Sequence, residues 1–369
     1  IQKALQQVEA AGLLDNGFPG FAHLRVKVYR GGSEMCEVEE TTFLRALEAG
    51  TPIPSMRPSH PAFSELPENT VVHSVETLAS VSAIMEKGAD WFAAYGNPEE
   101  RGTKVLSLKG VDFPGIIEVP LGTPLRKIIY EIGDGLSQGR EFKLARVGGP
   151  SGGLLPEDLL DTPVGYRSLE EAGAMVGNGE ILVGGLDTCV VDLVCSGAST
   201  VQAASCGRCV FCREGTVQIL AILGDITRGK GKPEDLELLR ELGEHMQTQS
   251  LCLLGTSAPK SLLTCLCHFE EELEAHIKKK RCPAVVCQKF VSYYISPELC
   301  RGCGECIESC PADAIDGGEG LIHVIDPLDC EKCGNCLERC PHGAVARYSG
   351  VKPRTPPKPV PIGTWRKRD

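Results

Sequence analysis

Nineteen cysteines carry most of the chemistry available to this 369-residue sequence, and eleven of them fall in three clusters built on Cys-x-x-Cys spacing. Such spacing indicates metal ligation in a reducing compartment rather than a disulfide framework. Two segments share one pattern, which is three cysteines at every third position followed by a Cys-Pro pair: Cys300, Cys303, Cys306 and Cys310-Pro311, then Cys330, Cys333, Cys336 and Cys340-Pro341. The duplicated pattern predicts two [4Fe-4S] clusters.

The ligands of these two clusters are expected to cross between the segments. Three closely spaced thiolates wrap one cluster, and the fourth thiolate of each segment ligates the other cluster, as in bacterial ferredoxins. We therefore assign one cluster to Cys300, Cys303, Cys306 and Cys340, and the other to Cys310, Cys330, Cys333 and Cys336. A pair of zinc sites is the alternative, but zinc knuckles lack the third cysteine and the Cys-Pro ending. Two interlocked clusters leave no open metal position for a substrate, so they would conduct electrons.

A third cluster is predicted further upstream. Cys206, Cys209 and Cys212 stand just before a helical run at Thr216–Leu220. A loop that enters a helix offers backbone N–H groups and a positive dipole end, which favour an anionic cluster. We assign the fourth ligand to Cys252, because it ends the next helix before a Gly turn. Zinc is again the alternative.

The residues around this third site resemble a known family. Ser205-Cys206-Gly207-x-Cys209-x-x-Cys212-Arg213-Glu214-Gly215, followed by Ser250-Leu251-Cys252, resembles the NADH-binding flavoprotein subunit of respiratory complex I. With the two-cluster segment appended, the chain also resembles the β subunit of electron-bifurcating [FeFe]-hydrogenases and NAD(P)-linked formate dehydrogenases, which implies anaerobic metabolism. The resemblance covers most of the chain. Through Gly148–Gly153 it implies a β-grasp (SLBB) domain.

The flavin-domain motifs of that family are matched incompletely. The family has an Asn-Asn pair before Val75-Glu76-Thr77-Leu78, where this sequence has His73-Ser74. Val38 replaces the Gly that precedes Glu39-Glu40-Thr41 in the family, and a side chain there obstructs close approach to a nucleotide. The family's Gly-rich phosphate loop is absent from this sequence. We therefore expect that the chain binds neither FMN nor NADH and that residues 1–100 persist as a scaffold.

A zinc site is also a candidate. His276, Cys282 and Cys287 have borderline ligand spacing. They resemble an element of the hydrogenase β subunits that is thought to hold zinc, and the resemblance implies that Cys189 completes the ligand set. Three thiolates and an imidazole suit closed, structural zinc. The alternative is buried free cysteines and a surface histidine. Cys265 and Cys267 are interpreted as packing residues.

These sites require an α+β chain of several domains. We expect a degenerate flavin-domain remnant over residues 1–100 and a β-grasp domain over 101–186, with strands near 104–108 and 115–119 and a helix near 124–130. Apolar stripes indicate a helical bundle over 187–281, one of them running from Leu262 to Ile277 and capped by Thr256 or Ser257. A linker (282–294), the ferredoxin-like domain (295–347) and an extended Pro-rich tail (348–369) that cannot form a core complete the chain.

Charge and composition narrow the function. A net charge of −11 argues against a nucleic-acid partner, and neither an 18-residue apolar run nor a signal peptide is evident. The reducing compartment that the cysteine clusters indicate predicts a cytoplasmic protein. The main hypothesis is an electron-transfer subunit that relays single electrons between partner subunits of an oxidoreductase complex and has no substrate site of its own. The expected partners are flavin- or metal-containing catalytic subunits and soluble ferredoxin. Acidic residues of the ferredoxin-like segment suit a partner with a basic surface. These acidic residues are Glu305, Glu308, Asp313, Asp316, Asp326, Asp329 and Glu331. The alternatives are an NAD(P)H dehydrogenase whose flavin segment lies upstream of residue 1, and a structural adaptor with vestigial clusters.

Overall fold

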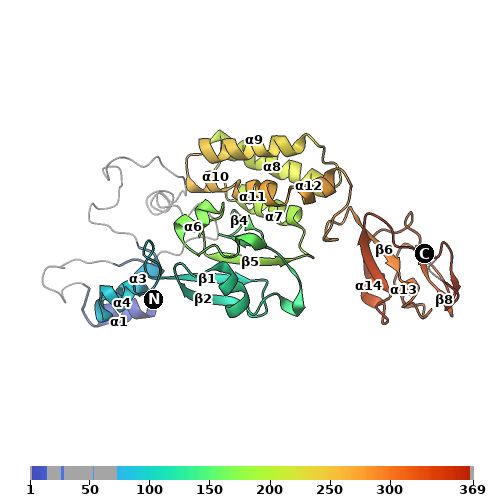
Figure 1. The fold of residues 1–369 in the computed structure, drawn as a ribbon, viewed down its shortest axis with the longest axis horizontal. Coiled ribbons are helices and arrows are strands. Elements are labelled where there is room, and N and C mark those ends of the chain that lie inside the picture. Colours follow the sequence, from blue (N-terminus) through green and yellow to red (C-terminus); the bar gives the residue numbers. More distant parts are fainter. Residues whose placement is uncertain (1, 15–25, 29–52, 54–72, 366–369) are drawn as a thin grey trace. The chain divides into compact units, whose positions relative to one another are not determined.

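The computed structural model describes residues 2–14, 26–28, 53 and 73–365, and the chain divides into two compact units, Ile1–Glu68 and Asn69–Asp369 (Figure 1). One helix is described in the first unit, α1 (Gln2–Ala10). Val38 and Glu39-Glu40-Thr41, on which the expected loss of the flavin site partly depends, lie outside the described residues. Among the described helices, none is both long enough and apolar enough to cross a membrane.

The second unit opens with α3 (Val75–Lys87) and α4 (Ala89–Ala93). Ser74 is the N-cap of α3, and its Oγ accepts a hydrogen bond from the Thr77 N–H at 3.1 Å. Glu76 accepts a hydrogen bond from the Val105 N–H at 2.8 Å and forms an ion pair with Lys104. Ser74 and Glu76 thus start a helix and tie it to the first strand of the sheet.

A five-stranded sheet follows, in the order β2-β1-β5-β3-β4. The expected strands and helix are present as β1, β2 and α5, with α5 continuing into a π-helical turn at Ile128–Ile132. β1 pairs parallel with β5, and the other neighbours in this described sheet are antiparallel. The elements are β1 (Thr103–Lys109), β2 (Gly115–Pro120), α5 (Leu125–Lys127), β3 (Phe142–Val147), β4 (Gly153–Leu155), α6 (Tyr166–Glu171) and β5 (Glu180–Gly185), with 3₁₀ turns at Ser137–Gly139 and Glu157–Leu159.

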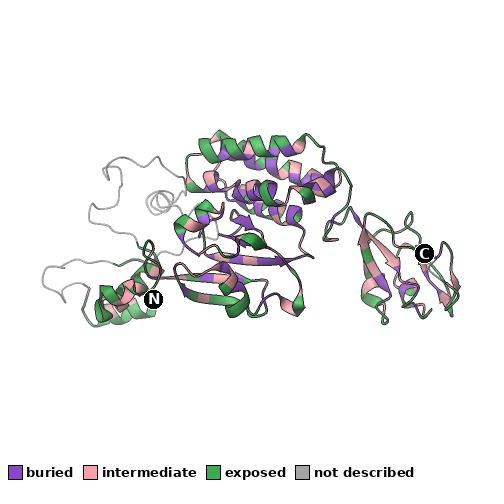
Figure 2. Cartoon of the chain, in the orientation of Figure 1, coloured by how far each residue is buried: buried purple, intermediate pink, exposed green. Residues whose placement is uncertain are grey.

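A helical bundle packs on this sheet, and the two share one hydrophobic core that includes Leu144 of β3 and Leu154 of β4. The Leu154 N–H donates to the Thr264 Oγ1 at 2.9 Å, which joins β4 to the bundle. Figure 2 shows the buried residues concentrated where sheet and helices meet. The helices are α7 (Val190–Ala203), α8 (Val210–Thr227), α9 (Asp235–Gln249), α10 (Leu253–Ser257), α11 (Lys260–His268) and α12 (Glu270–Ile277).

Two details of the bundle differ from the sequence-based expectation. The apolar stripe from Leu262 to Ile277 spans two helices, because the chain breaks at Phe269 between α11 and α12. The N-cap of α11 is Pro259 rather than Thr256 or Ser257, which lie within the preceding short helix α10. Both segments are amphipathic, and the apolar periodicity alone does not reveal the break.

The C-terminal part of the chain is built from short elements around its own small core. β6 pairs antiparallel with β10, and β7 pairs antiparallel with β9, so each half of the duplicated segment contributes to a two-stranded ladder. The elements are β6 (Val291–Ile295), α13 (Glu305–Glu308), β7 (Ile315–Asp316), β8 (Leu321–Ile322), β9 (Val324–Ile325), α14 (Asn335–Arg339), β10 (Val345–Ser349) and β11 (Val360–Pro361).

The Pro-rich tail contributes to this core, in contrast to the expectation of an extended segment with no core. β11 pairs antiparallel with β8, and the Ile362 N–H donates to the Gly320 carbonyl at 3.1 Å. Val360, Ile362 and Trp365 are partly buried against the core of the ferredoxin-like segment. Apolar residues near the end of the tail are buried, and the high proline content of the tail does not indicate this.

Candidate metal centres

The bundle site is formed where two helices begin. Cys209 is the N-cap residue of α8, Cys212 lies in the first turn of α8, and Cys252 is the N-cap residue of α10. A Cβ atom placed on Gly255 would lie 3.3 Å from the Cys212 Cβ, so the start of α10 abuts Cys212. α8 begins earlier than the helical run at Thr216 suggested. The Cys252 segment is therefore brought to the three-cysteine loop.

The four thiols of the bundle site interact electrostatically. Burial raises the pKa of Cys212 to about 11, and the neighbouring thiols of Cys206, Cys209 and Cys252 add to this rise. The Ser205 hydroxyl lies 3.4 Å from the Cys212 Sγ and opposes the rise. Burial likewise raises the pKa of Cys252, although the backbone N–H groups of Leu254 and Gly255 stabilise its thiolate. Donors already in place for sulfur suit an anionic metal cluster.

In the structure, the cysteines assigned to each ferredoxin-like cluster lie near one another, and the fourth of each set comes from the other half of the segment. Cys310 lines one pocket together with Cys330, Cys333 and Cys336, which are the four residues assigned to one cluster. At the other site, burial raises the pKa of Cys306 to about 12, with further contributions from Cys300, Cys340 and Cys303. We call the Cys306 set the first ferredoxin site and the Cys336 set the second.

The two ferredoxin sites have the same backbone geometry around their cysteines. Gly304 and Gly334 adopt left-handed conformations, with φ of 83° and 87°, and each turns the cysteine loop into a short helix. The Ala314 N–H donates to the Cys310 Sγ and the Ala344 N–H to the Cys340 Sγ, both at 3.3 Å. The crossing thiolates therefore receive matched hydrogen bonds. Four thiols with such donors at each site fit a [4Fe-4S] cluster.

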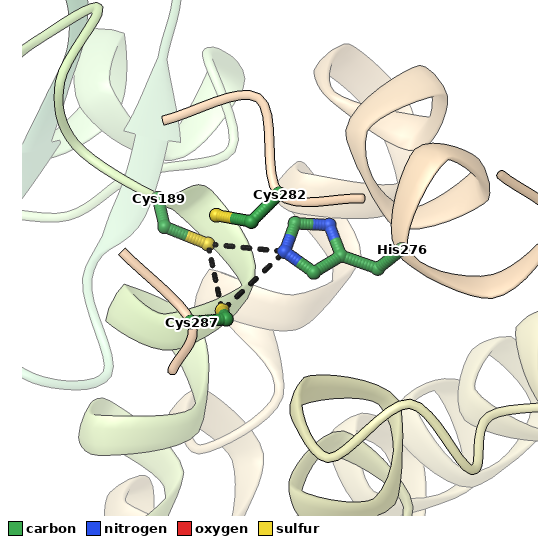
Figure 3. Close-up of side chains that lie close together, drawn as sticks. All are labelled: Cys189, His276, Cys282 and Cys287. Carbon is green, nitrogen blue, oxygen red and sulfur yellow. Dashed lines mark hydrogen bonds between the residues drawn. The ribbon is translucent and has the colours of Figure 1, made fainter. Parts of the chain in front are cut away.

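Cys189, His276, Cys282 and Cys287 converge in a fourth, buried site (Figure 3). Their ligand atoms all lie within 4.8 Å of one another. The His276 Nε2 is 3.4 Å from the Sγ atoms of both Cys189 and Cys287, which are 3.5 Å apart. Ligands of tetrahedral zinc lie about 3.7 Å apart, given Zn–S bonds of about 2.3 Å. The residues come from the start of α7, from α12 and from the segment after α12.

The surroundings of this site orient its ligands. The His276 Nδ1 donates to the Glu272 carbonyl at 2.7 Å, and since a carbonyl only accepts, Nε2 is left with its lone pair facing the sulfurs. Hydrogen bonds from the Cys189 and Cys287 thiols lower the pKa of Cys282 well below its usual value. The Val286 N–H also donates to the Cys282 Sγ at 3.3 Å. A cysteine with a lowered pKa and an imidazole nitrogen with its lone pair available therefore face each other in a buried site.

Four residues that support these sites are not recognisable from the sequence: Lys143, Glu272, Tyr293 and His323. Each acts through tertiary contacts, which spacing along the chain does not reveal. The remaining cysteines with described positions are apart from these sites: Cys265 is buried, Cys267 is exposed and Cys195 is half-buried. Cys36 lies outside the described residues.

Family models match the same two regions that hold the cysteine sites. The model of the NADH-ubiquinone oxidoreductase-F iron-sulfur binding region matches residues 192–276, and the model of a 4Fe-4S dicluster domain matches residues 299–344. The cysteines of the bundle site lie within the first match, and those of both ferredoxin sites lie within the second. The chain is therefore an iron–sulfur protein that binds [4Fe-4S] clusters.

Similar proteins define the family. The NADP-reducing hydrogenase subunit HndC of Solidesulfovibrio fructosivorans is 38% identical over 321 residues, which is 86% of this chain and 65% of that protein. The NADH-quinone oxidoreductase F subunit of Rickettsia bellii is 31% identical over 283 residues, covering 75% of this chain and 68% of that protein. The chain belongs to the family of NADH-quinone oxidoreductase F subunits.

A solved structure agrees with this assignment. A chain of an NAD+-reducing [NiFe]-hydrogenase, in the H2-reduced state, matches with a TM-score of 0.64 and 31% identity, over 75% of this chain and 48% of that chain. The mixed α+β fold is thus that of the same family, with a ferredoxin-like domain. The chain spans about 65% of the length of the first curated relatives it matches.

Proposed function

We propose that this chain relays single electrons between partner subunits of a multi-subunit oxidoreductase through three [4Fe-4S] clusters. The observation that carries the proposal is the grouping of twelve cysteines into three sets of four, one in the bundle and two crossed in the ferredoxin-like segment. A [4Fe-4S] cluster, when bound, accepts and releases one electron. The cysteine sets supply every ligand, so no position is left for a substrate.

The exposure of the ligands supports a relay. Cys303 and Cys333 are exposed, whereas Cys300, Cys306 and Cys336 are buried. Each ferredoxin site is thus shielded on its inner side and reachable from one outer loop. The acidic residues of the ferredoxin-like segment would favour a basic docking partner. Hydrogenase and quinone-reductase subunits among the relatives support an assembly with catalytic subunits, which we place in the cytoplasm.

We further propose that Cys189, His276, Cys282 and Cys287 hold structural zinc. The closed set of three sulfurs and one imidazole leaves no open position, which is typical of a structural site. The Cys282 N–H donates to the Ser349 hydroxyl of β10 at 2.8 Å, so the site also anchors the connection to the ferredoxin-like segment. In this proposal residues 101–186 are a β-grasp (SLBB) domain and residues 1–100 are a flavin-domain remnant that binds neither FMN nor NADH.

The second candidate is an NAD(P)H dehydrogenase subunit with a flavin segment upstream of residue 1. It is favoured by the relatives, whose names specify NADH or NADP and of which this chain covers about 65%. Against it stands Ser74, which serves as a helix N-cap where the family has a flavin-binding amide. A structural adaptor with vestigial clusters is the third candidate.

A metal and flavin inventory of the purified full-length protein tests these candidates. The relay requires about twelve irons and about twelve sulfides per chain, from three four-iron clusters, together with one zinc and no flavin. Photoreduction followed by electron paramagnetic resonance should then show three reducible clusters. A flavin absorbance band would favour the dehydrogenase, and iron far below twelve would favour the adaptor.

A further inference from the structure

The internal repeat places Tyr293 and His323 at equivalent positions. The two halves of the ferredoxin-like segment align so that Cys300 matches Cys330 and Ile295 matches Ile325, and the same offset matches Tyr293 with His323. The strand pairing is consistent with this alignment. Val345 pairs with Ile295, and their counterparts in the other half, Ile315 and Ile325, pair in the same way. At this matched position the two halves therefore differ, with tyrosine in one and histidine in the other.

His323 contacts the ligands of the first ferredoxin site. Its side chain is buried, and its Nδ1 lies 3.1 Å from the Cys306 Sγ. Its backbone N–H also donates to the Cys300 Sγ at 3.5 Å. A thiolate bound to iron and a carbonyl oxygen both only accept, and a neutral imidazole carries one N–H. The Nδ1 contact with the Cys306 Sγ is short for a hydrogen bond to sulfur, whereas the Nε2 contact with the Gly318 carbonyl oxygen, at 3.3 Å, is long for one to oxygen. We therefore place the ring proton on Nδ1, which donates to the Cys306 sulfur.

The ring of His323 is held in place by its neighbours. The Nε2 lies 3.3 Å from the Gly318 carbonyl oxygen. A Cβ atom on Gly317 would lie only 2.0 Å from the His323 Cδ2, so the ring occupies space that only glycine leaves open. β11 pairs with β8, directly before His323, and covers this edge of the hairpin. These contacts favour the orientation in which Nδ1 faces Cys306.

Tyr293 meets the second ferredoxin site differently. It lines the pocket of Cys330, Cys333 and Cys336, and burial followed by these thiols raises its pKa. Its hydroxyl lies against Gly334, 2.9 Å from where a Cβ atom would stand. Among the described residues, no hydrogen bond joins the Tyr293 side chain to a cysteine. The second site therefore lacks the side-chain donor that the first site has.

We infer that His323 is a positioning residue that separates the reduction potentials of the two ferredoxin sites. Hydrogen bonds to cluster sulfurs are among the determinants of cluster potential. A donor at Cys306 disperses negative charge on the thiolate and so favours the reduced, more negative state. The first site consequently holds the higher potential, and an electron that enters the segment rests there. This inference rests on the proposed relay, and it adds the order of potential between the two ferredoxin sites.

Two variants of the full-length protein isolate the hydrogen bond. His323→Phe keeps a ring but places carbon at the Nδ1 position, whereas His323→Asn keeps an amide nitrogen at that position. Redox titration monitored by electron paramagnetic resonance should show that His323→Phe shifts the one-electron equilibrium at least tenfold away from the first site, a fall of about 59 mV. His323→Asn should recover most of this shift, and Tyr293→Phe should leave the first site unchanged.

A measurement on the unmodified sequence covers the case in which His323→Phe fails to bind iron. Electron–nuclear double resonance of protein labelled with 15N-histidine should show imidazole coupling in the cluster signal of higher potential. Absence of that coupling, or equal potentials in the parent and in both His323 variants, would overturn the inference. Iron well below twelve in the parent protein would instead overturn the proposed relay, so the two failures are distinguishable.

Discussion

Lys143 of β3 and Glu272 of α12 form an ion pair between the sheet and the bundle, and their side chains retain only 12% and 9% exposure. The Lys143 Nζ also donates to the Thr188 carbonyl at 2.8 Å, and the Glu272 Oε1 accepts from the Val190 N–H at 2.9 Å. The two residues therefore hold the chain on both sides of Cys189. The sheet thus takes part in shaping the proposed zinc site.

Glu272→Gln should destabilise the protein by roughly 3–5 kcal/mol, because it leaves the Lys143 charge buried and unpaired. The amide oxygen still accepts from the Val190 N–H, so the change isolates the charge. Urea unfolding followed by circular dichroism measures the difference. Arg126→Gln, which removes an exposed ion pair with Asp161, is the matched control and should change stability far less. Equal effects would contradict the prediction.

Cys252→Ser should remove one cluster and leave two. A serine hydroxyl is a poor substitute for a soft thiolate, so iron should fall from about twelve to about eight per chain. Iron and sulfide analysis measures the loss. Cys267→Ser, which changes an exposed cysteine outside the sites, should keep all twelve irons. A Cys252→Ser protein with undiminished iron would exclude Cys252 as a ligand.

Cys287→Ser should remove zinc while the iron content remains near that of the parent. Structural zinc contributes directly to folding, so the unfolding temperature should fall as well. Elemental analysis and thermal unfolding followed by circular dichroism measure the two effects. The matched control is Cys195→Ser, which alters a half-buried cysteine of α7 outside the site. Retention of zinc in Cys287→Ser would count against the assigned ligand set.

Cluster assembly should release protons and become more favourable as the pH rises. Burial raises the pKa of Cys212 and Cys336 to about 11 and that of Cys306 to about 12, so in the metal-free protein these thiols stay protonated at pH 7. Iron must displace these protons. The same raised values mean that the metal-free fold loses stability as the pH rises above 9.0, the value for an ordinary thiol.

Reconstitution with iron and sulfide at several pH values, with proton release followed by a pH-stat, tests whether cluster assembly becomes more favourable as the pH rises. Less free iron should be needed for half-saturation at pH 9 than at pH 7. Cys195 has a raised pKa but is not a ligand, so Cys195→Ser should give the same proton release as the parent. An affinity that does not change with pH would refute the prediction.

Deletion of residues 360–369 should weaken the first ferredoxin site selectively. The deletion removes β11, which pairs with β8 beside His323, and Trp365, which is partly buried against the core of the segment. The rate at which the cluster signal disappears in air, followed by electron paramagnetic resonance, should rise for the first site only. Deletion of residues 366–369 alone retains β11 and is the control. Equal loss from both ferredoxin sites would show that the tail stabilises the whole segment instead.

Spacing in the sequence is informative where ligands are close along the chain. The three-cysteine loops and the strands at β1 and β2 follow from local patterns, and the structure contains them. Cys252 is predicted from a turn signal, and its meeting with Cys212 depends on helix packing. Cys189 comes from resemblance alone, since it lies far along the chain from His276.

The contacts that support the sites cannot be derived from the sequence, because they join residues that are far apart along the chain. Nothing local to Lys143 or Glu272 indicates that they pair, and the hydrogen bond from His323 to Cys306 requires the hairpin of β8 and β9. The prediction for the tail is wrong because prolines dominate its composition. Val360 and Ile362 become part of the folded segment only because β8 has an edge with which β11 can pair.

The late position of β11 in the chain has a consequence for biosynthesis. Domains emerge from the ribosome in order and fold as units, with the N-terminal parts first. All four cysteines of the bundle site precede the ferredoxin-like segment, whereas the first ferredoxin site needs Cys340 and then the covering strand at Val360–Pro361. The bundle site can therefore be assembled before the first ferredoxin site, whose covering strand β11 is the last of the described elements to be synthesised.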